Sequence, residues 1–403
     1  MVYIYILELF VCLISIGYAI GQSNRVYDSL GNVFAPKHNL YGIALVIFLI
    51  IIMSNAYFSD ITIYDKWYNM IMTNEYGLLR FEKGYSYFSY FCYKYLTLDF
   101  KQFLTLYVAI AIALIMISYL KVAGNFSFFV LFFLMYELFF SGVQLRNFMA
   151  ASLVVYGLVS MGKYGKRGMV IHILCVLGAT MFHSSSIAYI VFLLAKLDFE
   201  KIIGRIKKNK LLLSSAVTVF VFSSIYLERS GNFIKMLDKM SSMLGDDIVR
   251  RIGTHSTGLG FTGPMYISLL FMLYLFFIIY INGKGFISNI SYNKKWSLHN
   301  NKIIKEKVIV DNTYFYRFAQ KVNMIAILFL PFVFLSTTYY RLIRMVCMFD
   351  LVFFGALFES CRNRNGRLKI VIVTLLLTFL WVIYDLIWPG RFFSHIFGYL
   401  GVV

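Results

Sequence analysis

Runs of apolar residues of membrane-spanning length recur from one end of the 403-residue chain to the other. The runs are continuous and do not alternate with polar residues, which favours helices and disfavours a β-barrel. Because only helices and closed barrels satisfy their backbone groups in lipid, we predict an all-α polytopic membrane protein with about 12 transmembrane or re-entrant helices. The predicted segments are residues 2–20, 39–57, 102–120, 126–141, 147–162, 168–182, 185–197, 211–227, 264–282, 322–338, 344–360 and 370–388.

The stretches between these runs are short, so the chain has no room for a separate soluble domain. We therefore predict that residues 1–403 form a single integral membrane domain. Its longest polar segments are two predicted outer loops, 58–101 and 228–263, and one basic inner loop, 283–321. The first ten residues lack a basic region, so we expect the first apolar run to be retained as a helix and not cleaved as a signal peptide.

The composition agrees with a membrane protein. Hydrophobic residues make up 60% of the chain and charged residues only 14%, against about 25% charged in soluble domains. A net charge of +19 would suggest nucleic-acid binding in a soluble protein, but in a membrane protein it first reports topology, because basic loops stay in the cytoplasm. We therefore expect the lipid bilayer, and no nucleic acid, as a partner.

The distribution of charge along the chain predicts its orientation. With the amino terminus outside and a crossing at every segment, most Lys and Arg residues fall in the inner loops, and more acidic residues lie outside than inside. This asymmetry follows the positive-inside rule and places both termini on the outer side. The basic loop 283–321 is expected to lie on the anionic inner leaflet.

Two predicted segments, 168–182 and 185–197, are too short to span a bilayer comfortably. The sequence is basic both before the first segment and after the second. The chain therefore has to return to the side of the membrane that it left, as two short tilted helices or a re-entrant pair. The tip between them is His183 followed by three serines, and the preceding hairpin has its tip at Arg146. We predict that both tips lie at the outer surface.

Three arginines at the predicted outer boundary are the strongest candidates for function, because ionisable groups at membrane depth are costly. Arg146 lies between two apolar segments, and Arg341 and Arg344 are three residues apart on one face of a predicted helix. A guanidinium stays charged and binds phosphate through two nitrogens, so three of them suit a pyrophosphate. The alternative is structural, because arginines near helix ends also anchor a helix by reaching the interface.

Other polar residues offer acid–base or sugar-binding chemistry. His183 can accept a proton near neutral pH, or it can simply cap a helix. Asp60 directly follows an apolar run, where an active-site acid is expected, and Glu82 precedes an aromatic run that begins at Tyr85. Aromatic rings stack on sugars, but the run as a whole is more typical of a belt at the membrane interface.

Several classes of site have no motif in the sequence. The 6 histidines are scattered without metal-binding spacing, and none of the 5 cysteines forms a CxxC pair, so we predict neither a metal site nor a disulfide framework. No P-loop is present, and no GxGxxG or GxSxG occurs in a consistent context, which argues against an ATPase and an α/β-hydrolase. We expect no cofactor.

Four short motifs lie one after another along the chain, and all four are predicted at the outer face. They are Asp60-xxx-Tyr64, Glu82-x-Gly84-Tyr85, Gln144-x-Arg146-Asn147-xxx-Ala151 and Phe182-His183-Ser-Ser. Together they resemble the EpsG-like branch of the Wzy-type polysaccharide polymerases. Residues 40–200 carry most of the resemblance, and the carboxyl half is similar in hydropathy and in its Tyr-Arg-xx-Arg segment.

The resemblance implies a membrane glycosyltransferase of GT-C-like architecture that polymerises capsule, exopolysaccharide or O-antigen repeat units. Such enzymes work at the outer face of the bacterial cytoplasmic membrane. They transfer the growing chain from its polyprenyl pyrophosphate to a sugar hydroxyl of an incoming lipid-linked unit. The resemblance also implies a flippase and a chain-length regulator as partners.

This chemistry gives each candidate residue a hypothetical role. The three arginines would clamp the pyrophosphate, and His183 would orient or deprotonate the attacking hydroxyl, with Asp60 or Glu82 as the alternative base. The residues expected to bind substrate are Arg341, Arg344, Tyr64, Tyr85, Gln144 and Asn147. Three rival functions stay open: a flippase for lipid-linked oligosaccharides, a GT-C transferase with a lipid-monophosphate sugar donor, and an acyltransferase.

Overall fold

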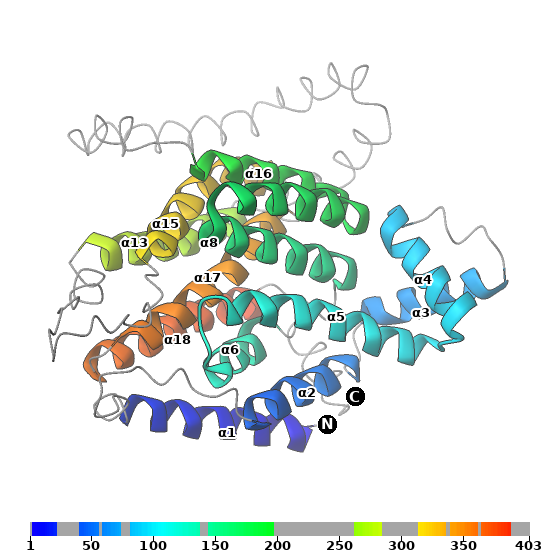
Figure 1. Cartoon of the computed structure of the whole chain (residues 1–403), viewed down its shortest axis with the longest axis horizontal. Coiled ribbons are helices and arrows are strands. Elements are labelled where there is room, and N and C mark those ends of the chain that lie inside the picture. Colours follow the sequence, from blue (N-terminus) through cyan, green and yellow to red (C-terminus); the bar gives the residue numbers. More distant parts are fainter. Residues whose placement is uncertain are drawn as a thin grey trace, which may run out of the picture. The chain divides into compact units, whose positions relative to one another are not determined.

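The computed structural model describes nine stretches of the chain, and within them the protein is helical, without a β-strand (Figure 1). This confirms the all-α prediction for these residues. The predicted segment 211–227, the outer loop 228–263 and most of the loop 283–321 lie outside the described residues. The described residues are 2–21, 40–55, 59–73, 81–137, 144–196, 262–283, 313–335, 339–361 and 364–387.

The helices form two compact units. The first comprises Met1–Ile190, Ile279–Ala319 and Met348–Val403, and the second comprises Val191–Ile278 and Gln320–Cys347. The helices of the second unit, some of which continue into the first, are α13 (Thr262–Gly283), α15 (Thr313–Ala326), η5 (Ile327–Phe329), α16 (Leu330–Leu335) and α17 (Tyr340–Ser360). The predicted segments 264–282, 322–338 and 344–360 fall on these helices, but helix also covers residues 313–321, which we predicted as loop.

The first unit is built around helix α5, Phe100–Leu120, which packs along α8, Leu145–Phe182. A capping box fixes the start of α5, because Asp99 accepts from the Gln102 backbone while the Gln102 side chain accepts from the Asp99 backbone. Helix α2 (Leu40–Ser54) also packs against α5. The unit further contains α1 (Val2–Gly21), α6 (Phe126–Phe132), η3 (Phe133–Glu137) and α18 (Arg364–Ile387), and α1 and α18 both pack against α6.

The stretch predicted as outer loop 58–101 contains two helices, α3 (Ser59–Thr73) and α4 (Lys83–Leu96). These helices were not predicted from the sequence, and the placement of this stretch outside the membrane stays a prediction. Each buries one face, including Tyr68 and Tyr85, and each mixes polar residues with aromatic and apolar ones along its length, so neither produces a continuous apolar run. Both helices pack near α5 and α4 also packs against α8, and this places the residues of the first two motifs close to those of the third.

Helix α8 is a hairpin, because the chain reverses at Gly165, which has φ +59° and ψ −125°. A side chain there would be strained, and glycine is the residue that adopts this conformation readily. The two arms lie in direct contact: a Cβ atom on Gly157 would come within 2.9 Å of His172 Nδ1, and one on Gly168 would collide with the Ser160 carbonyl. The separate predictions of segments 147–162 and 168–182 therefore correspond to the two arms.

The second arm continues into η4, a 3₁₀ helix over Ser184–Lys196, with His183 at the junction. His172 donates from Nε2 to the carbonyl of Tyr189 at 3.1 Å and so ties the start of η4 to the second arm. Two elements among the described residues, α5 and the α8 hairpin, are long and apolar enough to cross a membrane, and several shorter helices are apolar. A twelve-span GT-C arrangement stays a prediction.

Candidate functional site

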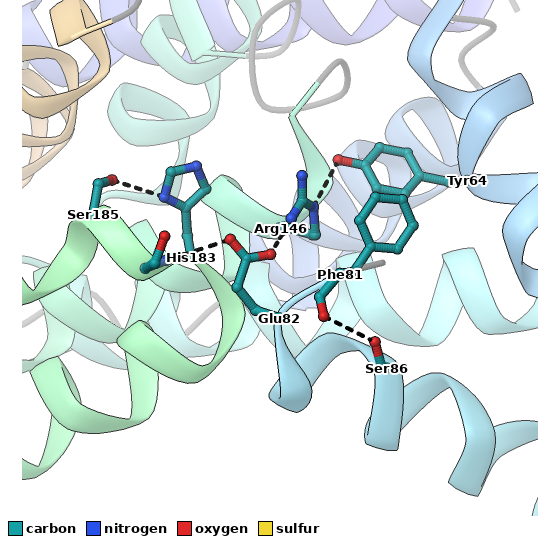
Figure 2. Close-up of polar contacts among 8 residues, drawn as sticks. Tyr64, Phe81, Glu82, Ser86, Arg146, His183 and Ser185 are labelled. Carbon is teal, nitrogen blue, oxygen red and sulfur yellow. Dashed lines mark hydrogen bonds and ion pairs between the residues drawn. The ribbon is translucent and has the colours of Figure 1, made fainter. Parts of the chain in front are cut away.

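Three helix ends meet in the first unit and bring together residues from three of the sequence motifs (Figure 2). Glu82 immediately precedes α4, Arg146 is the second residue of α8, and His183 ends the second arm of α8. Because the hairpin reverses at Gly165, Arg146 and His183 return to the same end of α8 although they are far apart in sequence. The structure thus places them at one end of the hairpin, as the two predicted tips require.

Glu82 links these elements. Its Oε2 forms an ion pair with Arg146 Nη1, and its Oε1 accepts from the backbone N–H of Ser184 at 3.4 Å (Figure 2). The side chains of Arg146 and Glu82 are 24% and 15% exposed, so the pair is sheltered but still open to solvent. Glu82 was predicted as an alternative base. Here its carboxylate forms an ion pair with Arg146, the residue that we expected to bind an anionic substrate.

Aromatic rings surround the guanidinium of Arg146. The centre of the Phe81 ring lies 4.4 Å from Arg146 Cζ, within cation–π range, and Arg146 Nε donates to the Tyr64 hydroxyl over a long 3.4 Å. The Tyr64 ring is 5.5 Å from those of Phe81 and Tyr85, measured between centroids. Burial raises the pKa of the Tyr85 phenol, so this hydroxyl stays neutral.

The amino ends of α4 and α8 are not capped by their own side chains, because neither Glu82 nor Gln144 makes a capping hydrogen bond. The first backbone N–H groups of a helix carry partial positive charge and attract anions. Two such ends and a guanidinium together make this region suited to an anionic ligand.

Gly84 explains why α4 comes so close to the hairpin. A Cβ atom at this position would lie 2.7 Å from both Cβ and the carbonyl oxygen of Met181, near the end of α8. Only a residue without a side chain permits this approach. The Glu82-x-Gly84 spacing therefore places a carboxylate beside Arg146 and allows the helix behind it to pack on α8.

The structure places His183 at a helix cap, and its role as a proton acceptor stays a prediction. It follows the last residue of α8 as the C-cap, and its backbone N–H donates to the Ala179 carbonyl at 2.8 Å, which agrees with the helix-cap alternative. Its ring is half-buried, and Nδ1 lies 2.7 Å from the Ser185 hydroxyl. The ring can therefore be oriented by Ser185, and which of the two donates depends on the tautomer.

The remaining predicted residues are placed as follows. At the start of α8, Asn147 Nδ2 donates to Gln144 Oε1 at 3.2 Å, and these residues lie one after and two before Arg146 in the sequence. Asp60 is the second residue of α3, one turn before Tyr64, and its side chain is not among those that the structure describes. Arg341 and Arg344 are on α17 in the second unit, half-buried and 5% exposed respectively. Their convergence with Arg146 stays a prediction.

Sequence reasoning missed two neighbours of the ion pair. Phe81, adjacent to Glu82, provides the ring over Arg146, and Tyr107 lies beneath the site on α5. The aromatic run after Glu82 hinted at such contacts, whereas Tyr107 sits in a spanning segment where nothing distinguishes it from core residues. Within the described part of the chain, no group of three His, Cys, Asp or Glu side chains is arranged to hold a metal ion.

Comparison with known proteins gives a family that covers most of the chain. No curated protein matches it, and no solved structure does. The model of the EpsG family matches residues 39–395, which leaves out only helix α1 and the ends of the chain. Because this match covers most of the sequence and includes every candidate site residue, the chain belongs to the EpsG family and is a membrane protein of the polysaccharide-polymerase type.

Proposed function

We propose that this protein is a metal-independent glycosyltransferase that joins polyprenyl-pyrophosphate-linked oligosaccharide repeat units at the outer face of the bacterial cytoplasmic membrane. Family membership supports a polymerase-type protein. The observation that supports this particular reaction is the Arg146–Glu82 pair at the uncapped starts of α4 and α8. A pyrophosphate leaving group needs fixed positive charge where its negative charge develops.

In this proposal Glu82 holds the place of the substrate anion. A diphosphate carries more charge than a carboxylate and accepts two parallel hydrogen bonds from a guanidinium. It therefore displaces Glu82 from Arg146, while the amino ends of α4 and α8 contribute further attraction. A role of Arg341 and Arg344 in binding the diphosphate stays a prediction from the sequence.

The reaction forms one glycosidic bond and breaks the bond between the anomeric carbon of the donor and the diphosphate oxygen. The non-reducing sugar hydroxyl of the acceptor attacks the anomeric carbon of the donor, whose C–O bond to the diphosphate breaks with both electrons going to the leaving oxygen. Arg146 stabilises the charge that develops there. The proton of the attacking hydroxyl passes to His183 or to the displaced Glu82.

The test is the substitution Arg146→Ala in cells that depend on this protein for their polysaccharide. Losing one electrostatic donor of this kind costs about 10²–10³-fold in rate, so we expect single repeat units in place of polymer. Arg167→Ala is the matched control, because Arg167 is an exposed arginine on the same hairpin, near its turn. Near-normal polymer in membranes that contain Arg146→Ala would contradict the proposal.

The position of the single units separates the polymerase from a flippase. When a polymerase is lost, flipped single units remain accessible outside the membrane. When a flippase is lost, lipid-linked units are stranded inside. Surface labelling of the Arg146→Ala cells should therefore detect single units, and unlabelled units confined to the inner leaflet would favour the flippase.

A further inference from the structure

Tyr107 on α5 has a buried hydroxyl without a hydrogen bond, beneath the proposed anion site. Its side chain is 0% exposed, and its Oη is among the buried polar atoms that lack a partner. Its ring packs 5.7 Å from Tyr85 and 6.2 Å from Phe182, measured between centroids. Tyr107 therefore lies between the start of α4, which follows Glu82, and the end of the hairpin, which precedes His183.

An unpaired buried hydroxyl destabilises a folded protein, and phenylalanine would fill the same space without that cost. Packing alone therefore gives no reason for a tyrosine here. The contrast with Tyr119 on the same helix is informative, because that residue is equally buried but its hydroxyl donates to the Asn125 carbonyl at 2.9 Å. The Tyr107 hydroxyl needs a partner in a different state of the site.

The Tyr107 ring packs on Tyr85, which lies one turn after Glu82, and on Phe182, which is adjacent to His183. Among the residues that the structure brings together at this site, Glu82 carries a carboxylate, which is a strong acceptor for a hydroxyl. In this structure Arg146 holds that carboxylate, so Glu82 becomes available as an acceptor when Arg146 changes its partner.

We propose that Tyr107 is a positioning residue that donates a hydrogen bond to Glu82 once a diphosphate has taken Arg146. The proposal rests on the function proposed above. A carboxylate displaced from its arginine is costly in a sheltered site unless another donor receives it. The Tyr107 hydroxyl is neutral and buried, and it supplies that donor. It therefore makes diphosphate binding easier without contacting the ligand.

The experiment measures the affinity of the full-length protein in lipid nanodiscs for polyprenyl diphosphate. Tyr107→Phe should weaken binding about tenfold, the effect of losing a hydrogen bond to a charged group. In a Glu82→Ala background the same substitution should have no effect, because the acceptor is already gone. Tyr119→Phe is the matched control, and its effect on affinity should be the same with and without Glu82.

Two outcomes would overturn the role of Tyr107: unchanged affinity in the single variant, or an equal loss of affinity in both backgrounds. The second outcome would show a general effect of Tyr107 on the fold or a direct contact with the ligand. The unfolding temperature of Tyr107→Phe should not fall, because no existing hydrogen bond is lost.

The same assay tells a failure of this proposal from a failure of the proposed function. If Arg146→Ala leaves the affinity for polyprenyl diphosphate unchanged, the anion site itself is wrong. If Arg146→Ala abolishes binding while Tyr107→Phe shows no coupling to Glu82, only the role of Tyr107 is overturned.

Discussion

Helices α5 and α6 begin with amides that the protein itself satisfies, whereas α4 and α8 begin beside an arginine and without a side-chain cap. At α5 the cap is the Asp99–Gln102 box, and at α6 the Asn125 side chain accepts from Phe128. At α4 and α8 the residues in the capping position, Glu82 and Gln144, make no such bond. The first kind of helix start is complete in structural terms, and the second retains its attraction for an anion.

The comparison is sharpest between two glutamates. Glu359 accepts backbone N–H groups of Gly124, at 2.6 Å, and of Asn125, and so fixes the turn before α6 to the end of α17. Glu82 is instead held by the side chain of Arg146 and by a long bond from one backbone amide. The two backbone amides are fixed in the turn and have the Glu359 carboxylate as their acceptor, whereas a guanidinium on a side chain can exchange one anion for another. Glu359 is therefore structural, and Glu82 is suited to displacement.

The largest effect is expected from exchanging the two charges, with Arg146→Glu and Glu82→Arg in one protein. The ion pair is preserved, so the protein should reach the membrane in normal amount. The guanidinium now starts from α4, and polymer should fall by at least about 10²-fold because the anion site is displaced. Gel analysis of chain length and a membrane immunoblot measure both quantities. Polymer of normal amount and length in this double variant would mean that the Arg146–Glu82 pair has only a structural role.

The next effect concerns the close approach of α4 to the hairpin. Gly84→Ala introduces a Cβ atom 2.7 Å from the Met181 backbone, so α4 has to move away and carry Glu82 with it. We expect polymer to fall about tenfold to a hundredfold, the cost of misplacing a group by roughly 1 Å. Gly17→Ala is the control, because nothing lies within 4 Å of its added Cβ. Equal chain lengths in the two variants would contradict this explanation of the motif.

A smaller and different effect is expected at the structural glutamate. Glu359→Gln removes the charge that two backbone amides share and should lower the free energy of unfolding by about 1–3 kcal/mol. A lower unfolding temperature of the purified protein measures this loss. Affinity for polyprenyl diphosphate should be unchanged. Weaker ligand binding at unchanged stability would remove the distinction drawn between the two glutamates.

The smallest effect is expected at the capping box of α5. Asp99→Ala removes the side-chain cap from the Gln102 amide and should cost about 1 kcal/mol, measured by thermal unfolding. Chain length should stay the same. A shortened polymer in this variant would show that the start of α5 also contributes to the site.

Much of the fold was predictable because hydropathy detects helices that are apolar all round, as at α5 and α18. Helices α3 and α4 were not detected, since polar residues and tyrosines interrupt their apolar residues. Charge placement predicted that Arg146 and His183 lie at loop tips on the same side of the membrane. The pairing of Glu82 with Arg146 was not predictable, because it depends on how closely Gly84 lets α4 approach. The role of Tyr107 could not be identified from the sequence, since a tyrosine within an apolar run is indistinguishable from an ordinary core residue.

The glycine turn of α8 has a consequence for how the site keeps its dimensions. Arg146 and His183 are carried by the two arms of one hairpin, and the arms are locked by direct contacts such as that of Gly157 with His172. Their separation is thus an internal property of a single folded unit. We therefore expect the cation and the imidazole to keep their spacing when the thickness of the surrounding bilayer changes, because both belong to one packed hairpin.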